Sequence, residues 1–220
     1  LTANSVTVTA DGMLSHDLKW YNMNAIQSKE NYTISSSFNK QVKESFLGRL
    51  NYNYNGRYYL TVTARWDGSS NFAANQKWGF FPAAAFRWTI KNEDFLLHAT
   101  WLNDLSLRLS AGRSGNDAIS AYKSLNLVNT GRGSWVFGHQ YNLTSYPQQI
   151  ANRELTWETT DSFNLGLNFE AFRSRLKIEA DLYWSRTSDL LLTVKQSQVI
   201  GYDKYLDNFG NTENYGVEVT

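Results

Sequence analysis

The sequence contains no cysteine, only two prolines, and no long apolar run. Without cysteine, disulfides, thiol catalysis and Cys-based metal sites are excluded. No segment approaches the ~20 consecutive apolar residues that a transmembrane helix needs. The first residues also lack a basic stretch followed by an apolar one, so we expect no signal peptide in this chain.

An excess of charge of either sign is also missing. The chain has 21 basic and 20 acidic residues, which are intermixed and leave a net charge of +1. A nucleic-acid partner would require a basic stripe, so none is expected. His16, His98 and His139 are isolated, and neither a His-Glu-x-x-His nor a Gly-x-Ser-x-Gly string occurs. The sequence therefore predicts no enzyme, no metal site and no cofactor.

What the chain has instead is a strict two-residue alternation of apolar and polar side chains. It occurs between residues 58 and 67 and again between 176 and 184. Successive side chains of a strand point to opposite faces, so these segments are predicted to be strands with one apolar face. In the first of them the apolar positions are Tyr58, Leu60, Val62, Ala64 and Trp66.

About eight antiparallel strands are expected over the whole chain, and a short helical turn is expected from Asp94 to Ala99. No repeat or linker indicates a domain boundary, so residues 1–220 are predicted to form one β-sheet wall without a plug domain. The expected strands are 1–10, 42–54, 57–67, 78–90, 104–113, 155–170, 175–189 and 210–220.

The positions of the apolar residues also predict the hairpin registers, because cross-strand neighbours must share a face. Around Asn55 the apolar positions are even on both sides, which requires a three-residue turn, 55–57, that pairs Tyr54 with Tyr58 and Leu50 with Val62. Around Phe172 they change from odd to even, which requires a turn of even length. A turn centred on residues 172–173 pairs Leu167 with Ile178.

Short turns and long connections are predicted at opposite ends of the strands. The turns at 55–57 and 171–174 fall at one end, and the long segments 11–41, 68–77, 114–154 and 190–209 at the other. This arrangement is typical of outer-membrane barrels, whose long loops are extracellular. Two features fit less well: the connection 91–103 is long yet lies at the short-turn end, and Pro82 lies inside a strand, where it cannot donate to the ladder.

The apolar face could contact lipid or a protein core. Its predicted positions from 46 to 66, 105 to 111, 163 to 169 and 176 to 184 contain no charged residue. Aromatic residues recur eight positions apart, at Tyr58 and Trp66, which corresponds to about 20 Å across a bilayer for a tilted strand. We therefore predict an antiparallel transmembrane β-barrel. The alternatives are a soluble sugar-binding β-sandwich and a small eight-stranded outer-membrane barrel with a structural or adhesive role, which would pair 1–10 with 210–220.

From about residue 40 to the end, several separated strings resemble the C-terminal barrel portion of SusC/RagA-type TonB-dependent outer-membrane transporters. The chain departs from the usual family pattern at Trp66, at Arg113-Ser114 and at Tyr215. The strings are GRLNYNY at 48–54, RYYLT at 57–61, DGSSNF at 67–72, WGFFP at 78–82, WLN at 101–103, GN at 115–116, LTWETT at 155–160 and ENYGVE at 213–218.

The resemblance implies that the chain is a slice of a 22-stranded barrel in the cell outer membrane of a Gram-negative, Bacteroidetes-like bacterium. It also implies import of oligosaccharides or peptides, a SusD-like surface lipoprotein as lid, and contact with the TonB complex through a plug that lies outside this chain. The partners expected are therefore that lipoprotein, TonB, outer-membrane lipid and the substrate.

Two groups of residues are candidate functional residues. On the polar face, Glu179 and Asp181 could mimic the carboxylate pair of a glycosidase or a metal site, but Lys177 shares their face, so we expect a polar wall that lines water or contacts a plug. In the long loops, exposed aromatic residues among small polar ones suit stacking on sugars or docking a partner, or else pack the loop on itself. The wall group is Arg65, Arg108, Lys177, Glu179 and Asp181, and the loop group is Trp135, Phe137, His139, Tyr141, Tyr202 and Tyr205.

Overall fold

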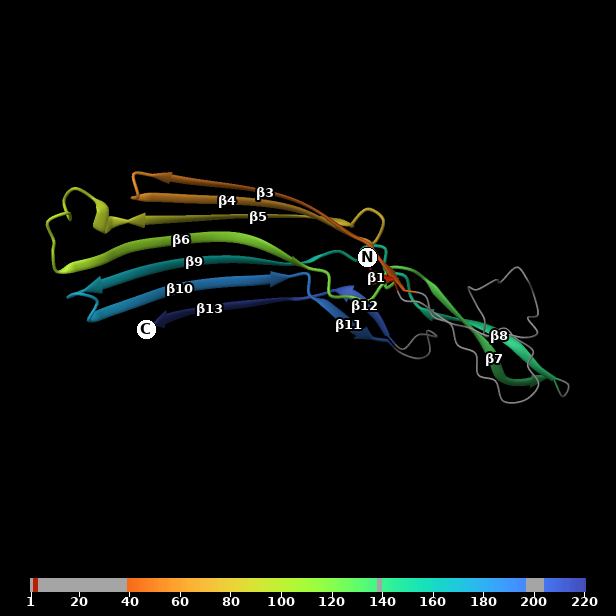
Figure 1. Cartoon of the computed structure of the whole chain (residues 1–220). Helices are drawn as coiled ribbons and strands as arrows, with labels where there is room; N and C mark the ends of the chain where they lie inside the picture. Colours follow the sequence, from red (N-terminus) through yellow and green to blue (C-terminus); the bar gives the residue numbers. More distant parts are fainter. Residues whose placement is uncertain (1, 4–38, 138–139, 197–203) are drawn as a thin grey trace.

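Seven long antiparallel strands form a single curved sheet in the computed structural model, which describes residues 2–3, 39–137, 140–196 and 204–220. The strand order is β13-β10-β9-β6-β5-β4-β3, and in Figure 1 these strands lie side by side in one layer. The strands are β3 (Lys43–Tyr54), β4 (Tyr58–Ser69), β5 (Trp78–Thr89), β6 (Leu102–Asn116), β9 (Glu158–Ala171), β10 (Leu176–Ser188) and β13 (Asn211–Val219).

Three two-stranded ladders accompany this sheet. They are β1 (Thr2–Ala3) with β2 (Lys40–Gln41), β7 (Leu127–Phe137) with β8 (Gln140–Gln149), and β11 (Leu191–Lys195) with β12 (Lys204–Asn208). Two of the ladders, β7–β8 and β11–β12, lie in the segments 114–154 and 190–209 that the sequence predicted as loops. In Figure 1 they extend past the end of the long strands, on the side opposite the short turns. We call this side the loop end.

The predicted register of the first hairpin is confirmed. Tyr54 pairs with Tyr58 and Leu50 with Val62, and the turn is Asn55-Gly56-Arg57. Asn55 and Gly56 both have positive φ, at 52° and 63°, and the Gly56 N–H donates to Asn53 Oδ1. Positive φ at a turn position is available to glycine without steric cost and to asparagine at little cost, which explains this pair of residues.

The second hairpin has the predicted even parity but a different pairing. Leu176 pairs with Ala171, so four residues, 172–175, make the turn, and Leu167 pairs with Ala180 rather than Ile178. The prediction of the Leu167–Ile178 pair was wrong by two positions. A shift of two residues leaves each side chain on its original face, so the apolar face is preserved.

The short helical turn that the sequence predicted from Asp94 to Ala99 lies a few residues earlier in the structure, still at the short-turn end. A 3₁₀ turn covers Ile90–Asn92, whereas residues 94–99 form successive turns rather than the expected helix. Asn103, near the start of β6, ties this end of the sheet together: its Oδ1 accepts the backbone N–H groups of Arg173 and Ser174 in the β9–β10 turn. Among the described residues, no helix is long and apolar enough to cross a membrane.

Pro82 is accommodated because one of its neighbouring ladders stops beside it. It pairs with Ala64 of β4, while the ladder between β5 and β6 begins at Ala83 and Gly112. The missing N–H of proline therefore falls at the point where β6 leaves β5 and continues alongside β9 alone.

The apolar face, which we call the outer face, is open in this structure. Leu60, Val62 and Ile178 are 37%, 40% and 38% exposed, although large aliphatic side chains are normally buried in a soluble core. Within the described ranges no second sheet covers this face, which contradicts the β-sandwich alternative. The small closed barrel would require the segment 1–10 to pair with β13. The described part of that segment, Thr2–Ala3, pairs with Lys40–Gln41 instead.

Candidate functional site

A buried cluster closes over the inner, polar face of the sheet at the loop end. Phe81 projects from the inner face of β5, and Trp157, just before β9, packs edge-on against it with ring centroids 5.2 Å apart. Phe72, from the loop after β4, packs against Trp157 in a tilted arrangement with ring centroids 4.9 Å apart, and Leu155 is fully buried in the same cluster. Two loops that are distant in sequence therefore meet here.

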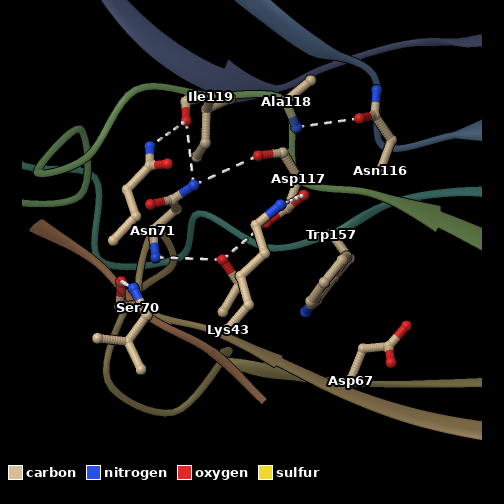
Figure 2. A network of polar contacts seen from close by, with 12 residues as sticks. Lys43, Asp67, Ser70, Asn71, Asn116, Asp117, Ala118, Ile119 and Trp157 are labelled. Carbon is tan, nitrogen blue, oxygen red and sulfur yellow. Dashed lines mark hydrogen bonds and ion pairs between the residues drawn. The ribbon is translucent and has the colours of Figure 1, made fainter. Parts of the chain in front are cut away.

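Asn71 joins these loops by hydrogen bonds. It is 1% exposed, and its Nδ2 donates to the backbone oxygens of Ile119 and Asp117 at 3.0 and 3.4 Å. The Asp117 carboxylate accepts from Lys43 Nζ at 2.8 Å and from Ser69 Oγ at 2.9 Å, so one loop residue is bonded to β3 and β4 together. Figure 2 shows this network beside Trp157. The loop segment 117–119 is thus fixed against the ends of the strands.

A cavity of about 550 Å³ lies next to this network. The loop after β4, the segment 122–126 and the segment 151–153 form its walls. It combines apolar surface with polar and cationic groups. The residues that line it include Lys40, Phe72, Lys77, Tyr122, Leu125 and Arg153.

The charged residues predicted on the polar face are paired with one another. Arg108 Nη2 lies 3.0 Å from Asp181 Oδ2, and Lys177 Nζ lies 2.7 Å from Glu179 Oε1. Arg65 forms an ion pair with Asp67 at 2.7 Å. Each carboxylate of the apparent Glu179–Asp181 pair is thus held by its own cation. Among the residues that the structure describes, no three His, Asp or Glu side chains lie close enough together to hold a metal ion.

A row of alternating charges crosses the outer face near the loop end. Arg113, Asp161, Arg186 and Glu213 are successive cross-strand partners on β6, β9, β10 and β13. The Arg113 guanidinium donates two hydrogen bonds to the Asp161 carboxylate, at 2.6 and 2.8 Å. The indole N–H of Trp184 donates to Glu213. This row lies beyond the uncharged apolar positions of the same strands.

At the short-turn end, Glu93 is surrounded by donors. Its carboxylate accepts from the Tyr58 hydroxyl at 2.6 Å, from the Trp88 indole N–H at 2.9 Å and from Arg57 at 3.1 Å. These bonds, above all that of Tyr58 and then that of Trp88, hold the pKa of Glu93 below its ordinary value. The rings of Tyr58 and Trp88 are also stacked, with centroids 6.3 Å apart, which gives this end an aromatic band.

Four of the six predicted loop residues lie on strands of the two short ladders. Trp135 and Phe137 belong to β7 and Tyr141 to β8, while His139 and Tyr202 lie outside the described residues. Tyr205 of β12 is half-buried and lines a separate cavity of about 230 Å³ with Lys123 and Ile150. Sequence reasoning missed Asn71, Phe72 and Trp157 as a group, although DGSSNF and LTWETT, which contain them, are two of the strings quoted above.

Comparison with known proteins agrees with this architecture. The family model described as "TonB dependent receptor-like, beta-barrel" matches residues 4–220. TonB-dependent receptor SusC of Bacteroides thetaiotaomicron is 41% identical over 178 residues, which is 79% of this chain and 18% of that receptor. TonB-dependent receptor P39 of Formosa agariphila is 34% identical over 205 residues, covering 93% of this chain and 18% of the receptor.

Solved structures show the same arrangement of strands. The RagAB peptide importer in the closed-closed state superposes with a TM-score of 0.76 and 29% identity, over 88% of this chain and 21% of that one. The siderophore receptor PirA from Pseudomonas aeruginosa shares the fold, with a TM-score of 0.53 and 16% identity, over 81% of this chain and 30% of its own. The chain spans about a fifth of the length of the curated relatives it matches. It belongs to the TonB-dependent receptor family and forms part of the wall of an outer-membrane β-barrel of the SusC/RagA type.

Proposed function

We propose that this wall segment belongs to a transporter that imports oligosaccharides or peptides across the outer membrane, driven through TonB and closed from outside by a SusD-like surface lipoprotein. The identity with SusC and the structural similarity to the RagAB peptide importer support this proposal. The plug that would contact TonB lies outside the chain. The segment's own role is binding and translocation rather than catalysis.

The observation that carries the proposal is the difference between the two faces of one sheet. Below its charged row, the outer face presents uncharged, exposed apolar side chains, which suit contact with lipid. The inner face presents paired charges and amides, which suit a water-filled passage: Arg108, Asp181, Lys177 and Glu179 would line water or contact the plug. A sheet with these faces can separate lipid from an aqueous path.

The loop end is where we place contact with substrate or lid. Its buried cluster and hydrogen-bond network hold the first loop residues in place. Beyond them, the ladders β7–β8 and β11–β12 carry four of the residues predicted to stack on a substrate or dock the lipoprotein: Trp135, Phe137, Tyr141 and Tyr205. The other two, His139 and Tyr202, are assigned the same role and lie outside the described residues. Flat apolar rings among polar residues suit both partners.

Gene deletion in the native host tests the proposal directly. A strain that lacks the complete receptor is compared with wild type for uptake of fluorescent oligosaccharides and peptides too large to diffuse through porins. We expect the deletion to abolish uptake of one class and the complemented strain to regain it, with monosaccharide uptake unchanged as control. Equal uptake of every oligomer by both strains would refute an import function. Affinity purification of the tagged receptor is expected to recover a surface lipoprotein.

A further inference from the structure

The cavity at the loop end has an uneven distribution of charge. Lys40, Lys77 and Arg153 line it, and none of the described residues that line it is acidic. Elsewhere in the described wall, several cations lie against acids at close range, as in the Arg108–Asp181 and Lys43–Asp117 pairs. Three cations facing one cavity without a lining carboxylate form a site that attracts an anion.

The walls of this cavity are held together by hydrogen bonds. The backbone N–H of Ala73 donates to the oxygen of Leu155, which joins the loop after β4 to the segment before β9. The Lys40 N–H donates to the Tyr122 hydroxyl at 2.9 Å, and Gln149 Nε2 donates to the Tyr122 backbone oxygen at 2.7 Å. A ligand would thus meet a cavity that is already formed, which lowers the entropy lost on binding.

The backbone beside two of the cations is fixed independently of their side chains. The backbone oxygen of Lys77 accepts from Ser69 N at 2.9 Å and from Trp157 Nε1 at 3.1 Å. Asn152, next to Arg153, donates to the Leu206 oxygen and to Asp207. The charged ends of Lys77 and Arg153 are exposed, so substituting them leaves these anchoring bonds in place.

The rest of the lining indicates which kind of anion fits. Leu125 and Ala74, which are exposed, contribute apolar surface, and Tyr122 and Asn126 contribute polar groups. A small inorganic ion would use the cations alone. A carboxylate carried on a larger, partly apolar unit would use the cations for its charge and the rest of the lining for the unit itself, which is the usual composition of a ligand pocket.

We propose that this cavity binds a carboxylate group of an acidic oligomer on its way into the barrel. This inference rests on the proposed import function and names the chemistry of the substrate. The carboxylate could belong to a uronic-acid sugar or to an acidic peptide, and the lining does not distinguish between these sources. Arg153 and Lys77 contact the carboxylate, and the ring or chain that carries it lies against Leu125 and Ala74.

Calorimetry on the complete purified receptor in detergent tests this proposal. The probes are trigalacturonate and its neutral methyl ester, and triglutamate and triglutamine peptides that are both amidated at the C-terminus. We expect at least one carboxylated probe to bind about tenfold or more tightly than its neutral partner and to weaken as salt is raised, because only the carboxylate gains charge-assisted hydrogen bonds, and salt screens them. Which pair shows the difference identifies the source.

A double variant and a matched control localise the site. Lys77→Gln with Arg153→Gln is expected to remove the preference for the charged probe, whereas Arg173→Gln with Arg175→Gln, the same charge change at the opposite end, leaves it intact. Arg153→Lys serves as a second variant: it keeps the positive charge and is expected to keep the preference for the charged probe. Equal binding of charged and neutral probes, no binding of any probe, or an unaltered preference in the double variant overturns the proposal. Binding is measured without transport, so a receptor that binds carboxylates but imports nothing would refute the proposed function alone.

Discussion

Arg108 and Asp181 form an ion pair across an intervening strand. Both pair in register with Gly166 of β9, one from β6 and the other from β10, and Nη2 of Arg108 reaches Oδ2 of Asp181 at 3.0 Å. The pair is possible because Gly166 has no side chain between them. A Cβ at this position would lie 2.6 Å from Asp181 Oδ1 and 2.8 Å from Arg108 Nη2.

Gly166→Ala is therefore expected to displace this ion pair and to lower stability by about 1 kcal/mol, the range for partly exposed pairs. Gly48→Ala is the matched control, since a Cβ there has no atom within 4 Å. Both substitutions change backbone entropy alike, so the difference in urea midpoint between the two variants of the complete receptor measures the pair. An equal midpoint would show that the guanidinium relaxes without loss.

Removal of the Asn71 side chain is expected to loosen the loop that follows β6. Asn71→Ala leaves the backbone oxygens of Ile119 and Asp117 without their buried donor, a loss of about 1–3 kcal/mol. We expect faster protease cleavage within residues 117–126. Gln76→Ala, an exposed amide in the loop after β4, is the control and should leave cleavage at the wild-type rate. Unchanged cleavage in the Asn71 variant would contradict the tethering role.

Trp157 contributes packing and one hydrogen bond, which two substitutions separate. Trp157→Phe retains an aromatic ring beside Phe72 and Phe81 but loses the N–H that donates to the Lys77 oxygen, for a cost of about 1 kcal/mol. Trp157→Ala also creates a cavity and should cost about 3–5 kcal/mol. Thermal unfolding of the detergent-solubilised receptor gives both values. Equal destabilisation by the two substitutions would mean that packing contributes little here.

Two adjacent residues on β9 test the assignment of the faces. Leu165 lies on the outer face between Leu109 and Leu182, so Leu165→Lys places a charge in the apolar band at a cost of about 2–4 kcal/mol. Asn164→Lys adds the same charge on the inner face and should be tolerated. The amount of folded receptor in outer-membrane fractions, judged by heat-modifiable gel mobility, compares them. Similar yields would contradict the lipid-facing assignment.

The hydrogen bonds of Glu93 should make the free energy of unfolding of the receptor fall in acid. Its pKa is lowered in the folded protein, chiefly by the Tyr58 hydrogen bond, so its contribution is complete at pH values above the ordinary glutamate pKa of about 4.3 and is lost as the pH falls through the folded value. Glu93→Gln should weaken the receptor at pH 7 and remove part of its acid sensitivity. Urea midpoints at several pH values give the answer. Parallel pH profiles for wild type and variant would exclude this origin.

Parity made much of the sheet predictable from the sequence. The apolar residues have even numbers on both sides of the first turn, which correctly predicted the Tyr54–Tyr58 pair. They change from odd to even numbers at the second turn, which correctly predicted that β9 and β10 share one outer face. Parity cannot separate registers that differ by two, and the pairing of Leu167 was wrong for that reason. The ladder β7–β8 was missed because Gly131 and Gly133 weaken the strand pattern of β7. The ladder β11–β12 was missed because each of its strands has only 5 residues, too few for a clear alternation.

The site was less predictable than the sheet. Placing Arg108 opposite Asp181 requires the register between β6 and β9, which a connection of some forty residues separates, as the bounds Asn116 and Glu158 show. The contact of Asn71 with Ile119 has no periodic signal at all, since both residues lie in irregular backbone. The charged residues of the polar face were predicted because the alternation along a strand shows which face each side chain occupies. The alternation does not show which partner each charged side chain contacts.

The charged row Arg113–Asp161–Arg186–Glu213 has a consequence for how the wall sits in its membrane. Sliding the segment inward by two residues would carry four ionised groups toward hydrocarbon, where an arginine costs up to about 2–4 kcal/mol, while sliding outward would expose the apolar band to water. The immersion depth is thereby set from both directions. Because the cavity lies farther toward the loop end than this row, its lysines are kept out of the hydrocarbon.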